Sequence, residues 1–126
     1  MNVKRRIIVT STSVFAIAMV SLIIYFILSM TTMWFLPEGS LISTTQSPNG
    51  VYSINCYLIE EGATNAESIR AELVNHEKKL FKTKNIYWQY RTTSTDVEWI
   101  SDSVVVINDI ELEIKHDTYD YRNFIE

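Results

Sequence analysis

Residues 4–37 read KRRIIVTSTSVFAIAMVSLIIYFILSMTTMWFLP and divide the chain into two unlike parts. After the basic residues 4–6, no charged residue occurs until Glu38. A helix rises about 1.5 Å per residue, so about 20 apolar residues cross a hydrocarbon core about 30 Å thick. The stretch therefore predicts a transmembrane helix over 7–36, which ends at Pro37 because proline cannot continue a helix.

The charges on either side of this helix predict its direction. Three basic residues precede it and no acidic residue accompanies them, so the positive-inside rule keeps that end in the cytoplasm. A cleaved secretory signal is the alternative, but the apolar run is long for a signal, and residues 29–31 make a poor cleavage site. We expect a single-pass cell-membrane protein with four parts: a cytoplasmic tail over 1–6, an anchor over 7–36, a connector over 37–46 and an extracytoplasmic domain over 47–126.

The composition after the anchor limits the classes of partner. Eight basic and fifteen acidic residues remain there, a formal charge of −7, which argues against nucleic acid and against flat docking onto an anionic lipid leaflet. Cys56 is the sole cysteine, so no internal disulfide forms. Three roles stay open for it: a small buried hydrophobe, an intermolecular disulfide, or a catalytic thiol.

Alternating apolar and polar residues dominate the outer part of the chain. Residues 51–60 follow the turn sequence Ser-Pro-Asn-Gly at 47–50 and alternate with the period of two that is typical of a strand. Asn108-Asp109 is a candidate tight turn between two further strands. Additional strands are expected over 84–90, 97–100, 104–107 and 110–114. The sequence therefore predicts a small all-β domain, an antiparallel meander of five or six strands that forms a sandwich or a half-open barrel.

Residues 66–74 fit two structures. Thr64-Asn65-Ala66-Glu67 matches a helix capping box, and intrinsic propensity favours a helix after it. However, Ile69, Ala71 and Leu73 also alternate with Arg70, Glu72 and Val74, as in a strand. The residues alone leave both open.

Several short motifs together resemble a known family. They are Ser47-Pro48-Asn49-Gly50-x-Tyr52, Gly62-Ala63-Thr64, Ile69-Arg70-x-Glu72-Leu73, Lys84-Asn85-Ile86-Tyr87-Trp88-x-Tyr90, Trp99-Ile100-x-Asp102, Val106-Ile107-Asn108 and Asp117-x-Tyr119-Asp120-x-Arg122. In these the chain resembles a family of small, uncharacterised membrane-anchored proteins of Gram-positive bacteria, the domain of unknown function 5412. The resemblance implies a strand over 69–74. It implies no activity, substrate or cofactor.

No residue cluster forms a recognisable catalytic motif. The acidic residues from Asp109 to Asp120 lack the glycine-centred loop that calcium sites use, so a solvated face is expected, and neither a metal nor a cofactor. Trp88 and Trp99 are expected in the core. For Arg70, pairing with a carboxylate such as Asp120 is a structural role as plausible as contact with a partner. The candidate interaction surface consists of Arg70, Glu72, Tyr87, Tyr119 and Arg122.

We therefore expect a non-enzymatic binding or accessory module at the outer face of the cell envelope. Its partners would be the lipid bilayer, through residues 7–36, and an unidentified envelope protein. An envelope hydrolase is the alternative, as is an immunity-type protein that blocks a toxin. The oligomeric state is left open.

Overall fold

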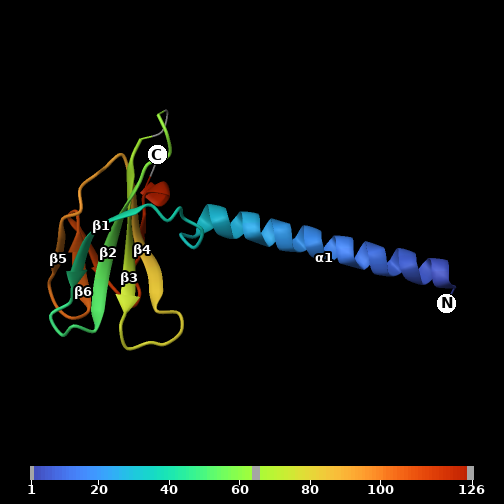
Figure 1. Ribbon diagram of the computed structural model, residues 1–126, viewed down its shortest axis with the longest axis horizontal. Coiled ribbons are helices and arrows are strands. Elements are labelled where there is room, and N and C mark those ends of the chain that lie inside the picture. Colours follow the sequence, from blue (N-terminus) through green and yellow to red (C-terminus); the bar gives the residue numbers. More distant parts are fainter. Residues whose placement is uncertain (1, 64–65, 125–126) are drawn as a thin grey trace. The chain divides into compact units, whose positions relative to one another are not determined.

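The computed structural model describes residues 2–63 and 66–124, which form two compact units, Met1–Phe35 and Leu36–Glu126 (Figure 1). The first unit contains helix α1 (Val3–Thr31). The second contains the β-domain. Its elements in the described ranges are β1 (Ser40–Gln46), β2 (Tyr52–Ile59), β3 (Ser68–Asn75), β4 (Thr83–Tyr90), β5 (Val97–Trp99), β6 (Val104–Ile107), β7 (Ile110–Glu113), β8 (Tyr119–Asp120) and the 3-10 helix η1 (Tyr121–Phe124).

Helix α1 is long and apolar enough to cross a membrane, and none of its described residues is buried. Asn2 caps its first turn, where the side-chain oxygen accepts a hydrogen bond from the Lys4 amide at 3.2 Å. Such a helix near the N-terminus is compatible with a single-pass anchor or with a signal sequence.

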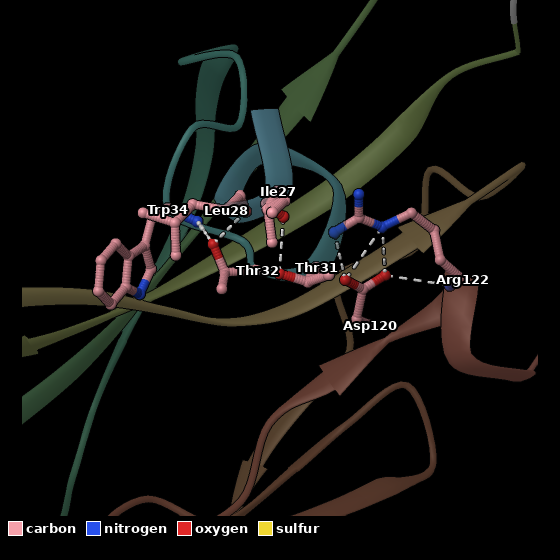
Figure 2. A network of polar contacts seen from close by, with 7 residues as sticks. All are labelled: Ile27, Leu28, Thr31, Thr32, Trp34, Asp120 and Arg122. Carbon is pink, nitrogen blue, oxygen red and sulfur yellow. Dashed lines mark hydrogen bonds and ion pairs between the residues drawn. The ribbon is translucent and has the colours of Figure 1, made fainter. Parts of the chain in front are cut away.

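Hydroxyl side chains in α1 bond back to the helix rather than to solvent. Thr10 Oγ1 donates to the Arg6 carbonyl at 2.7 Å. Thr12 and Ser13 likewise donate to the carbonyls four residues before them. At the other end Thr31 Oγ1 donates to the Ile27 carbonyl at 2.7 Å (Figure 2). These bonds satisfy the polar groups inside the helix, so Ser and Thr add little cost in a non-aqueous environment.

The β-domain contains two sheets. The larger has the order β1-β2-β3-β4-β8, in which β1 to β4 form an antiparallel meander and β8 pairs with β4 in parallel. The smaller is the antiparallel meander β5-β6-β7. The predicted antiparallel meander is therefore confirmed, except at β8.

One hydrophobic core joins the two sheets, which face each other in Figure 1. The larger sheet contributes Ile54, Cys56 and Ile69, and the smaller contributes Val105 and Ile107, all fully buried. The sheets remain separate and do not close into a barrel. The domain is a small sandwich, and the half-open barrel that the sequence also allowed is not formed.

Three elements decide between, or differ from, the sequence-based expectations. Residues 66–74, which fitted both a helix and a strand, belong largely to strand β3; residues 64 and 65 of the proposed capping box lie outside the described residues. The connector expected over 37–46 contains strand β1, because its Ser and Thr residues pair along β2. Helix α1 ends at Thr31, before Pro37, because Thr32 already has an extended backbone.

A β-bulge changes which face the residues of β4 occupy. Ala71 pairs with Tyr87, but the next residue, Glu72, pairs with Asn85, so Ile86 is an extra residue in β4. Such an insertion breaks the strict alternation of side chains. Ile86 and Tyr87 are consequently both buried, and Trp88 lies on the opposite face and outside the core cluster. The prediction that Trp88 fills the core was wrong, whereas Trp99 does pack against the core.

Asn108 connects the two sheets through the β6–β7 turn. Both Asn108 and Asp109 have positive φ, 45° and 70°, as the expected two-residue hairpin turn requires. The Asn108 side chain donates to the Tyr87 hydroxyl at 3.2 Å and to the Ser94 carbonyl at 2.6 Å, and it accepts from the Asp96 amide at 2.9 Å. The turn therefore holds the β4–β5 loop against the sandwich.

Gly39 permits the chain to pass close to β2, which gives a first testable prediction. Its φ is +73°, and a Cβ there would lie 2.6 Å from the Leu58 carbonyl oxygen. A left-handed backbone costs a non-glycine residue about 1–2 kcal/mol, and this backbone contact adds to it. Gly39→Ala is expected to lower the free energy of unfolding by more than about 2 kcal/mol, measured by urea unfolding followed by tryptophan fluorescence.

Gly62→Ala is the matched control. Gly62 also has a positive φ, +91°, but a Cβ there meets nothing within 4 Å. Gly62→Ala should therefore lower the free energy of unfolding only by the cost of the left-handed backbone, without the added cost of a close contact. Equal losses for the two substitutions would mean that the approach of Gly39 to Leu58 has no energetic consequence.

Candidate functional site

The outer face of the larger sheet, which points away from the core, carries a row of interacting polar and aromatic side chains. Tyr57, Arg70, Trp88 and Asp120 stand in register across β2, β3, β4 and β8. The row directly beside it, which begins at Cys56, belongs to the core face. We call the set on this outer face the outer-face network; it consists of Tyr57, Arg70, Glu72, Asn85, Trp88, Tyr90, Asp120, Tyr121 and Arg122.

Arg70 occupies the centre of one half of the outer-face network. Its guanidinium donates to Glu72 Oε2 at 3.1 Å, to Asn85 Oδ1 at 2.7 Å and to the Glu38 carbonyl at 2.7 Å. It also lies over the Tyr57 ring, 4.0 Å from its centroid. Arg70 is only 5% exposed, so it ties β3 to the segment before β1 and offers little surface to a partner. Arg70 does pair with a carboxylate, but this carboxylate belongs to Glu72 and not to Asp120, the example that the sequence suggested.

Asp120 and Arg122 form the other half (Figure 2). Arg122 Nε donates to both carboxylate oxygens of Asp120, at 3.0 and 3.1 Å, and Nη2 donates to Oδ2 at 2.6 Å. These bonds to Asp120 raise the pKa of the Arg122 guanidinium. The pair closes the short turn from β8 into η1, and it leaves the guanidinium partly exposed.

Aromatic rings pack around the Arg122 guanidinium. It lies 4.9 Å from the centroid of the Trp88 ring, and Tyr121 meets Trp88 edge-on at 4.8 Å. Tyr90 stacks on Tyr121 at 5.5 Å. Burial raises the pKa of the Tyr121 hydroxyl. Trp88, Tyr90 and Tyr121 are only partly buried, so this cluster presents aromatic edges beside Arg122 at the surface.

The structure separates the five residues that the sequence grouped as an interaction surface. Arg70, Glu72 and Arg122 belong to the outer face. Tyr87 and Tyr119 lie on the core face, where their rings stack at 5.4 Å. Tyr87 is 1% exposed, and this burial raises the pKa of its hydroxyl. Tyr87 is therefore not accessible to a partner, because the bulge at Ile86 turns it inward.

Sequence reasoning also missed several members of the network. Trp88 was assigned to the core, and the Glu38 carbonyl and Asn85 were not considered as partners of Arg70. Trp88 and Tyr90 lie in the motif that spans residues 84–90. Their large amphipathic rings are the sequence feature that could have pointed to a surface role. The bulge at Ile86 brings these rings to the outer face, but it cannot be recognised from the order of apolar and polar residues in the sequence.

Across residues 2–63 and 66–124, no group of three or more His, Cys, Asp or Glu side chains is placed to hold a metal ion. Ser53 Oγ lies 2.5 Å from His76 Nε2, a pair that the sequence did not reveal. Ser53 is 5% exposed, so its hydroxyl is not open to a substrate.

Cys56 gives a second testable prediction. It lies in the core, and burial raises the pKa of its thiol, so little reactive thiolate forms near neutral pH. The folded protein is expected to resist N-ethylmaleimide at pH 8 and to react fully in guanidinium chloride, as measured by intact mass. Rapid labelling of the folded chain, or a dimer that disappears on reduction, would contradict this burial.

Comparison with known proteins identifies the family of the chain. No curated protein matches the chain, and no solved structure does either. A family described only as a family of unknown function, DUF5412, matches residues 3–124, which include both α1 and the β-domain. The resemblance suggested by the motifs is thereby confirmed: the chain belongs to the family of unknown function DUF5412.

Proposed function

We propose that the chain is a single-pass membrane protein that holds a non-catalytic binding domain at the outer face of the cell membrane. The observation that carries this proposal is the surface of α1, on which large apolar side chains such as Phe15, Ile17 and Leu22 are all exposed. A helix that is apolar on all sides needs an apolar environment, and every backbone hydrogen bond inside it is satisfied internally.

The charge distribution supports the orientation. Lys4, Arg5 and Arg6 precede the apolar stretch, and every acidic residue follows it. Basic residues next to a membrane helix are retained in the cytoplasm. The β-domain, with its charge of −7, is then on the opposite side.

Anchoring can be tested on the full chain after expression. The protein should remain in the membrane pellet through alkaline carbonate extraction, and its intact mass should be that of the complete 14.6 kDa chain. Loss of the residues that form α1, with release of the β-domain, would identify a cleaved signal sequence and overturn the anchor.

The part of the β-domain best suited to a partner is the exposed part of the outer-face network. Trp88, Tyr90 and Tyr121 surround Arg122, and Trp, Tyr and Arg are the residue types that carry most binding energy at protein interfaces. Their mutual packing fixes the rings before a partner arrives, which lowers the entropic cost of binding.

Photo-crosslinking in membranes tests this binding role. Tyr121→Ser and Arg122→Gln are expected to lose the crosslinked products that the unaltered chain forms. Glu111→Gln is the matched control, because Glu111 is exposed on β7 of the other sheet. Products that survive Tyr121→Ser and Arg122→Gln would place the binding surface elsewhere.

A further inference from the structure

The β-domain separates its positive charges by residue type. Five lysines follow residue 6: Lys78, Lys79, Lys82 and Lys84 lie within seven residues around the β3–β4 loop, and Lys115 lines a groove together with three of them. The domain's three arginines lie elsewhere, and each contacts an aromatic ring. The acidic domain therefore has one strongly basic end.

Two large apolar side chains protrude between these lysines. Leu80 is 76% exposed and Phe81 is 93% exposed. Phe81 also has a φ of 52°, a conformation that is rare for a bulky residue. Exposing both rather than folding them onto the sheet gives up the stabilisation that burial of a Leu and a Phe supplies. We call residues 76–84 the basic loop.

A groove runs along the base of the basic loop. Its volume is about 250 Å³, and its lining includes Tyr52, Lys78, Phe81, Lys82, Lys84 and Lys115. An apolar ring and four ammonium groups thus border one concave surface. This combination suits a ligand that is anionic at one point and apolar next to it.

We propose that the basic loop docks onto a lipid surface that carries anionic headgroups. Leu80 and Phe81 enter the boundary between headgroups and acyl chains, and the lysines pair with the phosphates around them. Lys and exposed apolar residues together are the composition by which interfacial segments bind membranes. This step rests on the proposed anchoring, which brings a bilayer near the domain.

The charge of the rest of the domain means that only the basic loop is suited to approach an anionic lipid surface. The domain's overall charge of −7 opposes a flat approach to an anionic surface. The basic loop, in contrast, has four lysines and a single acidic residue, Glu77. Nucleic acid also carries phosphates, but it has no apolar layer for Leu80 and Phe81. The exposed Leu80 and Phe81 therefore favour a membrane over a soluble polyanion as the partner of the basic loop.

Vesicle flotation with the full chain tests the proposal. The chain is placed in phosphatidylcholine nanodiscs, and its co-elution with the disc scaffold protein tests anchoring separately. Vesicles that contain 30% phosphatidylglycerol are then added, and flotation is measured for chain in discs, whose α1 is already occupied; the free chain is measured only where no chain enters the discs. We expect flotation with these vesicles, at least tenfold less with pure phosphatidylcholine vesicles, and weakening by added salt.

Two pairs of variants assign the effect to the basic loop. L80S/F81S should reduce flotation at least tenfold, whereas Ile100→Ser, which alters an exposed apolar residue at the β5–β6 turn, should not. K82Q/K84Q should reduce it by more than tenfold, since each lysine near an anionic surface contributes about fivefold, whereas Arg91→Gln should not. Leu80, Phe81, Lys82 and Lys84 are all exposed, so thermal unfolding is expected to change by only a few degrees.

Three results would overturn the proposal. Equal flotation with the two vesicle types would remove the anionic requirement, and no flotation would remove lipid binding. Full flotation of L80S/F81S would show that charge alone acts, and it would remove the proposed entry of Leu80 and Phe81 into the lipid. Failure of the chain to enter nanodiscs would contradict the anchor alone.

Discussion

Arg70→Ala is expected to lower the free energy of unfolding by about 3–5 kcal/mol, because breaking a buried ion pair leaves a charge uncompensated. Arg70 is 5% exposed and holds Glu72, Asn85 and the Glu38 carbonyl at once. The substitution removes the donor from the Glu72 carboxylate and releases the segment before β1. Urea unfolding of the full chain in detergent, followed by tryptophan fluorescence, measures the loss.

Arg91→Ala is the control for Arg70→Ala. Arg91 lies over the Tyr90 ring at 5.5 Å but is exposed, so its loss should cost no more than about 0.5–1 kcal/mol. Arg70→Lys should recover only part of the stability, because an ammonium group cannot reproduce the planar fork of a guanidinium. A cost for Arg70→Ala near that for Arg91→Ala would show that the Arg70 contacts do not stabilise the sandwich.

Tyr87→Ala is expected to cost about 3–5 kcal/mol, the range for truncating a buried aromatic residue. Tyr87 is 1% exposed, stacks on Tyr119 and accepts a hydrogen bond from Asn108. Trp88→Ala should cost less, about 1–2 kcal/mol, because Trp88 is only partly buried and lies outside the core. Unfolding curves of the two variants give the comparison directly.

The order of these two effects tests the bulge at Ile86. Strict alternation along β4 would place Trp88 in the core and Tyr87 outside, so it would give the opposite order. Tyr87→Phe is the control for the hydroxyl, and it should cost about 1 kcal/mol, the usual contribution of one hydrogen bond. A larger loss for Trp88→Ala than for Tyr87→Ala would contradict the bulge.

The sequence predicts those strands of the domain whose side chains alternate without interruption. Ile54 and Cys56 in β2 and Leu112 in β7 belong to the apolar face of an alternating strand, and all three are buried in the core. One face of each strand is apolar and the other polar, so the burial of one face fixes the register. The Asn108-Asp109 turn was predictable for a similar local reason, since both residues tolerate positive φ.

Other elements depend on partners distant in the sequence. Strand β1 has exposed side chains and a Ser/Thr-rich sequence, and it exists because its backbone pairs with β2. Strand β8 has only two residues, which pair in parallel with β4. Neither strand has an alternating pattern long enough to be recognised, because both obtain their order from the neighbouring strand.

The outer-face network was predictable only in part. The sequence singled out Arg70, Glu72 and Arg122, and these residues do belong to one face. Their partners could not be derived, because Arg70 reaches the Glu38 carbonyl across more than thirty residues. The exchange of Tyr87 and Trp88 follows from a single inserted residue, which no periodicity reveals.

Cysteine accessibility in intact cells tests most directly the claim that the chain is anchored with its β-domain outside. Val3→Cys places an exposed thiol at the start of α1, and Glu111→Cys places one on the β-domain. The buried Cys56 should remain unreactive. A membrane-impermeant maleimide should label Glu111→Cys in intact cells and should label Val3→Cys only after the membrane is opened. Labelling of Val3→Cys in intact cells, protection of Glu111→Cys, or a mature chain that has lost residue 3 would contradict the account.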